Sequence, residues 1–189
     1  MRRPAPSTAT RTFPALAVAG GLVLFAASPA LAGADRVRAE GPLIRYGADP
    51  QIPAGAWARV QAVYDAAGST VVTLHVRGLQ PHHAYGAHAH QLACSQTDPL
   101  AAKGHYQHVP APVGTPASDP AYANPLNEIW LDVVTDEDGN GSAQTRVPWQ
   151  FSPDRRAGSV MLHAERTHDG TDGPAGTAGA RLACLTVDF

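Results

Sequence analysis

The chain has 189 residues, a formal net charge of −2 and two cysteines. Because no stretch clusters lysine and arginine into a basic stripe, the sequence argues against nucleic acid as a partner. Charged residues make up 16% of the chain, which also contains 18 glycines and 17 prolines. This composition favours turn-rich β structure over helices, and the length suits one domain with one core.

The first 32 residues have the features of a secretory signal peptide. Three arginines among the first eleven residues precede an apolar run over residues 13–27. This run is too short and too rich in glycine and alanine for a transmembrane span. Because Ala30-Leu31-Ala32 is a typical cleavage motif, we predict a signal peptide over residues 1–32. An uncleaved anchor is the alternative. The predicted protein is secreted, or held in the cell envelope or periplasm, with no membrane span after cleavage.

The first part of the exported chain predicts a β-hairpin and a further strand. Residues 33–55 are expected to form a loose lead-in with one short strand. Residues 57–65 alternate in part between apolar and polar side chains, and residues 69–79 are rich in β-branched residues with a period of two. The turn at residues 66–68 joins them into a hairpin. Residues 85–90 predict the next strand.

Two long loops interrupt the strands that follow. Residues 94–127 contain six prolines and little periodicity, and residues 164–180 are rich in glycine. Long irregular loops inside compact domains are usually functional or disordered. The remaining strands are predicted at 129–135, 142–148, 159–163 and 181–187.

The acidic stretch at residues 136–141 predicts a polar hairpin turn. A calcium site is the alternative, but the spacing and final glutamate of an EF-hand are absent. No repeat and no convincing amphipathic helix is found. The sequence therefore predicts an all-β fold, a Greek-key sandwich or barrel with two long functional loops and one disulfide.

The two cysteines predict that disulfide. Cys94 and Cys184 are the only cysteines in a chain with an export signal, and exported cysteines usually pair. A bridge between them closes a loop of about 90 residues. The loss of chain entropy in the unfolded state should then stabilise the fold by roughly 4–5 kcal/mol.

Histidines carry the chemistry of the sequence. His88 and His90 occupy alternate positions of a predicted strand, so both side chains point to one face and form a two-pronged metal clamp. His105 in the first long loop and His163 at the end of another strand are candidates to complete the site. Imidazoles without clustered thiolates suit copper or zinc, and a tetragonal all-nitrogen set suits Cu(II). Since neutral imidazole is the ligand form, binding should weaken as the pH falls through about 6.

From about Trp57 to Val187 the sequence resembles the copper/zinc superoxide dismutase family. The matching pieces follow the family's order, and the last, Gly-x-Ala-Gly-x-Arg-Leu-Ala-Cys, is highly specific. They are Gly86-Ala87-His88-Ala89-His90-Gln91, Gly104-His105-Tyr106, Asp138-Gly139-Asn140-Gly141, Val160-Met161-Leu162-His163-Ala164-Glu165, and the segment from Gly176 to Cys184.

The resemblance implies roles for individual residues. Arg181 is implied as the guanidinium beside the copper that attracts and positions superoxide, in agreement with the general attraction of small anions to a fixed positive charge in a cleft. Cys94 and Cys184 match the family disulfide, which pins the metal loop to the sandwich. The implied copper ligands are His88, His90, His105 and His163.

The implied reaction converts superoxide to oxygen and hydrogen peroxide in two steps. Copper takes an electron from one superoxide and gives it to a second. In the family, the histidine that matches His105 bridges copper and zinc, then leaves copper and is protonated in the reduced state. His105 and Arg181 are therefore the residues expected to act in catalysis.

The zinc half of the family's site is incomplete in this sequence. The family supplies two more histidines and an aspartate after the bridging histidine, whereas only His108 stands between His105 and His163. Asp119 and Asp132 are candidate ligands, but they do not complete a four-ligand zinc site.

We therefore expect a site that holds copper alone. In this hypothesis Glu128 hydrogen-bonds the outer nitrogen of His105, and so orients the imidazole as zinc otherwise would. The alternative is that Glu128 is a solvated residue at a strand edge. The loop from His163 to Arg181 is shorter than in typical family members, which predicts a more open site with weaker guidance of the substrate.

The sequence thus favours a secreted superoxide dismutase whose substrate is the superoxide anion. A non-enzymatic copper-binding or storage protein on the same scaffold is the alternative, and a structural sandwich with a decayed site is a third. Arg181 separates the first two, because storage needs no charge beside open copper. Dimers are common in the family, so a homodimer is a further expectation. The other histidines, at positions 75, 82, 83 and 168, are not expected to be ligands.

Overall fold

Antiparallel strands form most of the regular structure. The structure, a computed structural model, describes Met1 and residues 35–189, so the signal peptide predicted over residues 1–32 lies, apart from Met1, outside the described residues. The elements in chain order are β1 (Asp35–Pro42), β2 (Ile44–Arg45), β3 (Trp57–Tyr64), β4 (Thr70–Arg77), β5 (Ala84–Tyr85), β6 (Ala87–His90), a short 3₁₀ helix η1 (Pro99–Ala102), β7 (Val133–Val134), β8 (Gly141–Val147), β9 (Ser159–His163) and β10 (Arg181–Thr186).

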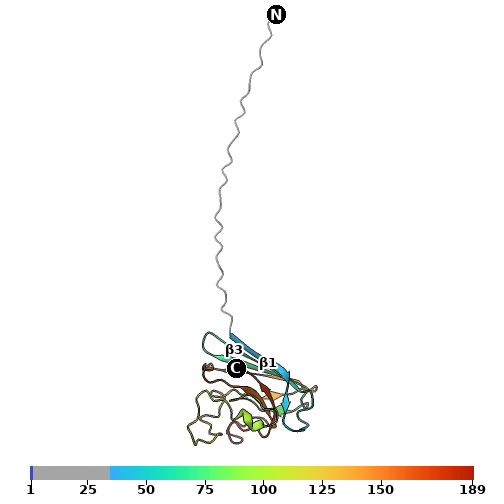
Figure 1. Cartoon of the computed structure of the whole chain (residues 1–189), viewed down its shortest axis with the longest axis vertical. Helices are drawn as coiled ribbons and strands as arrows, with labels where there is room; N and C mark the ends of the chain where they lie inside the picture. The colour runs from blue at the N-terminus through green and yellow to red at the C-terminus, as the bar shows by residue number, and fades with distance from the viewer. Residues whose placement is uncertain (2–34) are drawn as a thin grey trace. The chain divides into compact units, whose positions relative to one another are not determined.

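The strands build two four-stranded sheets. The first has the order β1-β3-β4-β8 and the second the order β2-β10-β9-β6, while β5 and β7 form a small ribbon. Some neighbouring strands are distant in sequence, such as β4 and β8, so the chain crosses over between them as in a Greek key. The predicted all-β sandwich is therefore confirmed, and Figure 1 shows the long loops gathered on the side away from β1 and β3. Within residues 35–189 no helix has the length and hydropathy to span a membrane.

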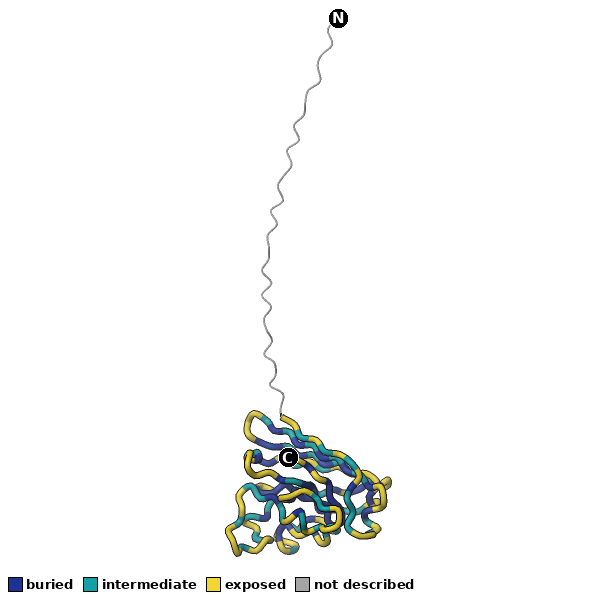
Figure 2. Tube along the Cα trace, in the orientation of Figure 1, coloured by how far each residue is buried: buried dark blue, intermediate teal, exposed yellow. Residues whose placement is uncertain are grey.

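The alternation of side chains explains why the first sheet faces the core. In β3 every second residue is buried, and β4 repeats this pattern. Since successive side chains of a strand point to opposite faces, Val60 of β3 and Leu74 of β4 lie in the core while Arg59 and His75 point outward. Figure 2 shows how buried and more exposed positions follow one another along the strands.

The second sheet is covered on both faces. All five residues of β9 are buried. Val160 and Leu162 enter the main core, whereas Met161 points to the other face and packs with Ala102 and Cys184 in a small second core. The loops that cover this outer face therefore carry apolar contacts of their own, and the functional residues described below lie among them.

The structure differs from the sequence prediction at the start of the domain. The sequence predicts one short strand in a loose lead-in over residues 33–55, whereas β1 is an eight-residue strand that pairs with β3 along its whole length. The signal was weak because the inward positions include only small or medium residues, Val37 and Ala39, which are partly buried against the core. The backbone pairing with the edge of β3 holds these residues in a strand, which their few apolar side chains do not predict by themselves.

A second difference lies at Gly86, which divides the strand predicted over residues 85–90. Residues before it pair with β7, and residues after it pair with β9. A Cβ at position 86 would lie 2.5 Å from Ala178 Cβ and 2.8 Å from the main-chain oxygen of Glu165. Glycine is therefore required where the chain changes partners, because the loop over residues 164–180 approaches its backbone closely.

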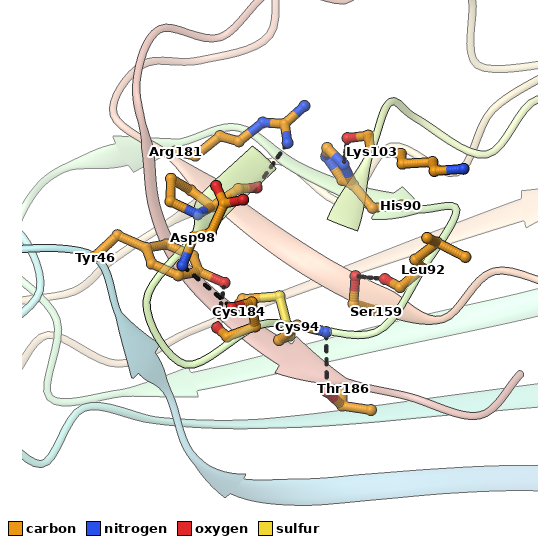
Figure 3. The surroundings of a disulfide bond; sticks show 12 residues. Tyr46, His90, Leu92, Cys94, Asp98, Lys103, Ser159, Arg181, Cys184 and Thr186 are labelled. Atoms are coloured by element: carbon orange, nitrogen blue, oxygen red, sulfur yellow. Dashed lines mark hydrogen bonds between the residues drawn. A yellow bond between two sulfur atoms is a disulfide. The ribbon is translucent and has the colours of Figure 1, made fainter. Parts of the chain in front are cut away.

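The predicted disulfide is present and ties the loop over residues 91–104 to β10. Cys94 and Cys184 are bonded across a sequence separation of 90. Around the bridge, the amide of Cys94 donates to Thr186 Oγ1 at 3.2 Å, and the Ser159 hydroxyl donates to the main-chain oxygen of Leu92 at 2.7 Å (Figure 3). The loop is thus held by both covalent and polar contacts.

Removing the bridge should lower stability by about 4–5 kcal/mol, because the unfolded chain regains the entropy of a long closed loop. We expect Cys94→Ala/Cys184→Ala to unfold at lower urea concentration than the oxidised wild type. The variant also serves as the control, since a reductant should shift only the wild-type curve. Equal unfolding free energies for the variant and the oxidised wild type would contradict this account.

Candidate metal centre

Four histidines cluster on the outer face of the second sheet. His88 and His90 belong to β6, His163 ends β9, and His105 comes from the neighbouring loop. One possible ligand atom from each residue lies within 4.8 Å of those from the other three. Within residues 35–189 this is the group of histidine, cysteine or acidic side chains arranged to hold a metal ion.

Strand register explains how the cluster forms. Ala87 and Ala89 face the core, so the two histidines of β6 point to the opposite face. β9 runs antiparallel beside β6 with Met161 opposite His88, which brings His163 to the same region. On the other edge, His105 and His90 form a bridge pair, and the amide of Tyr106 donates to the Ala89 oxygen at 2.8 Å.

Each imidazole uses one ring nitrogen to contact the protein. Three of them contact, through Nδ1, an oxygen that carries no proton, so Nδ1 is the donor and Nε2 keeps its lone pair. His88 is the exception, because its Nε2 contacts the Thr167 hydroxyl at 2.7 Å. The three pairs are His90 with the Lys103 main-chain oxygen at 2.9 Å, His163 with that of Gly179 at 3.4 Å, and His105 with Glu128 Oε2 at 2.7 Å.

The ring nitrogens that make no contact with the protein indicate a metal site. His88 Nδ1, His90 Nε2 and His163 Nε2 are buried and have no hydrogen-bond partner among the described residues. A buried polar atom without a partner costs about 1–3 kcal/mol, so three such atoms in one place indicate a shared ligand. Four imidazole nitrogens with no thiolate or carboxylate suit Cu(II), and the residues present therefore fit copper.

Burial keeps these imidazoles neutral. Desolvation lowers the pKa of His90 to about 2 and that of His163 to about 4, and the charge of a protonated His105 would add to both effects. The pKa of His88, which is fully buried, also lies well below its usual range for the same reasons. Neutral imidazole is the form that binds metals, so the environment prepares the ligands.

Glu128 lies directly behind His105. Its side chain is 1% exposed and accepts three hydrogen bonds, from His105 Nδ1, from Trp130 Nε1 at 2.8 Å and from Gln107 Nε2 at 2.9 Å. The contact expected from the sequence is therefore present, and the alternative of a solvated strand-edge residue is wrong. The hydrogen bonds from Trp130 and Gln107 to Glu128 were not predicted from the sequence. Trp130 stands two positions after Glu128 in an extended segment, so its place on the same side was the available signal.

Arg181 lines a cleft of about 580 Å³ together with His105 and His163 of the cluster. Arg181 begins β10 opposite His163, and its Nη1 donates to the Pro99 oxygen at 2.7 Å (Figure 3). Arg181 is the one lysine or arginine among the cleft residues in the described part of the chain. The other lining residues are Gln91, Gly104, Gln107, Ala111, Ala117, Ser118, Glu128, Ala175, Gly176, Thr177, Ala178 and Gly179.

The candidate zinc ligands do not join a metal group in residues 35–189. His108 stacks on Trp149, with ring centroids 4.7 Å apart. Asp119 accepts a hydrogen bond from a nearby main-chain amide in its own loop, and Asp132 accepts two from Thr167. The histidines at positions 75, 82, 83 and 168 also lie outside the cluster.

Comparisons with known proteins agree with this geometry. The family model described as copper/zinc superoxide dismutase (SODC) matches residues 57–187, while no curated protein matches the sequence. The solved Cu/Zn superoxide dismutase from Brucella abortus has a TM-score of 0.52 at 20% identity, over 79% of this chain and 100% of that one.

Two further solved structures share the fold. A double mutant of a SOD-like protein from Bacillus subtilis has a TM-score of 0.52 at 16% identity, over 80% of this chain and 95% of that one. The clock protein EA4 has a TM-score of 0.51 at 16% identity, over 80% of this chain and 92% of that one. At these identities the structural likeness shows the fold alone.

The family match covers most of the described domain. It includes both cysteines of the disulfide, the four clustered histidines and Arg181. The chain belongs to the copper/zinc superoxide dismutase family.

Proposed function

We propose that the protein is a superoxide dismutase that works with copper at the four-histidine site. The observation that carries the proposal is the convergence of four imidazoles beside a cleft that Arg181 lines, three of them with a buried ring nitrogen that has no hydrogen-bond partner among the described residues. When bound there, copper supplies a one-electron redox couple that superoxide can both reduce and oxidise.

Arg181 binds and orients the substrate. Superoxide is a small anion, and a guanidinium in a cleft attracts anions and offers them several donors in a fixed plane. The contact between Nη1 and the Pro99 oxygen holds the group in place, so the substrate meets an oriented charge. Glu128 also lines the cleft, but its carboxylate accepts three hydrogen bonds from neighbouring side chains. Apart from Glu128 and the two histidines, the other residues on the cleft wall are uncharged and mostly small, which supports the expectation of a weakly steered site.

His105 is suited to moving a proton between the cleft and the site. Its side chain is 16% exposed, more than the buried His88 and His90, and it lines the cleft. Because Nδ1 is held by Glu128, any proton taken up or released is exchanged at Nε2. The carboxylate also stabilises the positive charge that the imidazole carries while it holds that proton.

We also propose that the site holds copper without zinc. In the family, the residue that matches His105 bridges the two metals, which requires both of its ring nitrogens. Here Nδ1 is already engaged with Glu128 at 2.7 Å, and Glu128 is held by two further donors. The Glu128 carboxylate thus orients the imidazole of His105, as a second metal would otherwise do.

Export completes the proposal. The disulfide between Cys94 and Cys184 supports an oxidising compartment, because such bridges are rare in the reducing cytosol. Together with the signal peptide expected over residues 1–32, it favours a protein that acts outside the cytosol, in the envelope or beyond it.

The metal-free protein should lose stability in acid because the clustered histidines are buried in their neutral form. Below pH 6.5 the unfolded chain takes up a proton at His163, whereas the folded chain does so only near its pKa of about 4. Protons are thus bound preferentially by the unfolded state, and this one group should cost about 3 kcal/mol between pH 7 and pH 4.

Urea unfolding of the metal-free protein at both pH values measures this loss. The variant His163→Gln lacks the titrating group, so its stability should fall by about 3 kcal/mol less than that of the wild type over the same pH interval. An identical pH dependence for the two proteins would refute the assignment.

Superoxide decay tests the activity. We expect the purified protein, loaded with copper alone, to catalyse fast decay and His163→Ala to lose it, because one ligand is missing. Arg181→Ala should retain copper and lose roughly tenfold or more in rate, since the anion is no longer attracted. The control is Arg146→Ala, which removes an exposed arginine on β8 that pairs with Asp65 away from the cleft.

The outcomes separate the two candidate functions. Catalysis that depends on His163 and Arg181 establishes the dismutase. Tight copper binding without catalysis would instead favour the copper-binding or storage protein. Turnover that is unchanged in Arg181→Ala would contradict the part given to Arg181 in attracting the substrate.

A further inference from the structure

His88 is held differently from the other three histidines of the cluster. Their Nδ1 atoms face carbonyl or carboxylate oxygens, which only accept hydrogen bonds. His88 instead contacts the Thr167 hydroxyl through Nε2, at 2.7 Å. A hydroxyl can donate or accept, so by itself it does not determine which ring nitrogen of His88 carries the proton.

Asp132 resolves this ambiguity. Its Oδ2 accepts from the Thr167 main-chain amide at 2.8 Å, and its Oδ1 contacts the Thr167 hydroxyl at 2.5 Å. Since a carboxylate only accepts, the hydroxyl proton is directed to Asp132, and Thr167 Oγ1 must then accept from His88 Nε2. The proton of His88 is thereby placed on Nε2, and Nδ1, which is buried without a partner in the described residues, keeps its lone pair.

We propose that Asp132 and Thr167 form a positioning relay that selects this tautomer of His88 and makes Nδ1 a metal ligand. The identity of the metal rests on the proposed function, but the tautomer does not. Without the relay, the neutral ring would divide between two tautomers, and in one of them a proton would occupy the nitrogen that faces the cluster.

The packing around Thr167 fits a built contact. Thr167 is 5% exposed, and the loop that carries it lies directly on β6. The amide of Gly86 donates to the Glu165 oxygen at 2.6 Å, and a Cβ at position 86 would lie 2.9 Å from Thr167 Oγ1. The missing side chain at Gly86 thus allows the hydroxyl to reach the imidazole.

The extended segment over residues 128–132 supplies both carboxylates behind the cluster, those of Glu128 and Asp132. The amide of Leu131 donates to the Ala87 oxygen, and Trp130 forms a bridge pair with His88. Residues at alternate positions of such a segment share a face, so Glu128 and Asp132 lie on the same side as Trp130. Glu128 orients His105 directly, and Asp132 orients His88 through Thr167.

Nitrogen NMR of metal-free protein labelled with ¹⁵N-histidine tests the relay without copper or catalysis. We expect His88 to be a single tautomer with its proton on Nε2 in the wild type and in Thr167→Ser, which keeps the hydroxyl. In Thr167→Val, which keeps the shape and loses the hydroxyl, we expect a mixture of tautomers. The matched control is Thr171→Val, whose hydroxyl on the same loop contacts only Asp169 among the described residues.

Asp132→Asn provides a sharper variant. The main-chain amide of Thr167 still requires an oxygen, so the new NH₂ group faces the Thr167 hydroxyl and donates to it. The hydroxyl proton is then released toward His88 Nε2, and the population should shift to the tautomer with its proton on Nδ1. This variant also decides the question if Thr167→Val does not fold.

Copper affinity gives the second readout. Competition with a chelator should show Cu(II) binding weakened by about 10- to 100-fold in Thr167→Val and Asp132→Asn, and near wild type in Thr167→Ser and Thr171→Val. A single Nε2-protonated His88 in Asp132→Asn would overturn the relay, as would unchanged copper affinity. If the tautomer shifts while the wild type shows no dismutation, the relay stands and the proposed function fails.

Discussion

The site depends on one constraint, which is that four neutral imidazoles must each keep a ring nitrogen free of protons within 4.8 Å of the others. Burial excludes the charged form, because desolvation lowers the pKa of the three most enclosed histidines. Acceptors behind the rings determine which nitrogen carries the proton. Neither measure is sufficient by itself, since a neutral ring of the wrong tautomer presents a proton to the metal.

The fold meets this constraint with a rigid sheet and a tethered loop. The sheet spaces His88, His90 and His163, because their strands are paired in register. The loop behind the disulfide supplies the oxygen of Lys103 for His90 and the oxygen of Pro99 for Arg181. Catalytic loops are usually mobile, and here the bridge to β10 keeps two site contacts at constant positions.

The sequence predicts the parts of this arrangement that follow local rules. Alternation on a strand predicts that His88 and His90 share a face, and the paired cysteines predict the bridge. The resemblance to the family supplies His105, His163 and Arg181, which strand periodicity does not join. Glu128 is predicted because it falls near the position at which the family has a zinc-binding histidine that this sequence lacks.

Other parts could not be predicted because they depend on tertiary contacts. Asp132 and Thr167 meet across 35 positions of sequence, and the sequence predicts Asp132 only as a candidate zinc ligand and gives no role to Thr167. The full length of β1 is not predicted because its apolar positions are few, and the strand is held in place by pairing with β3. Both cases reflect partners that only the folded sandwich brings together.

Metal content tests the central claim most directly. After the protein is exposed to equal amounts of copper and zinc and then dialysed, elemental analysis should find one copper per chain and no retained zinc. This result follows if Glu128 occupies the outer nitrogen of His105 and the four imidazoles complete the copper site. One tightly held zinc per copper would contradict the account.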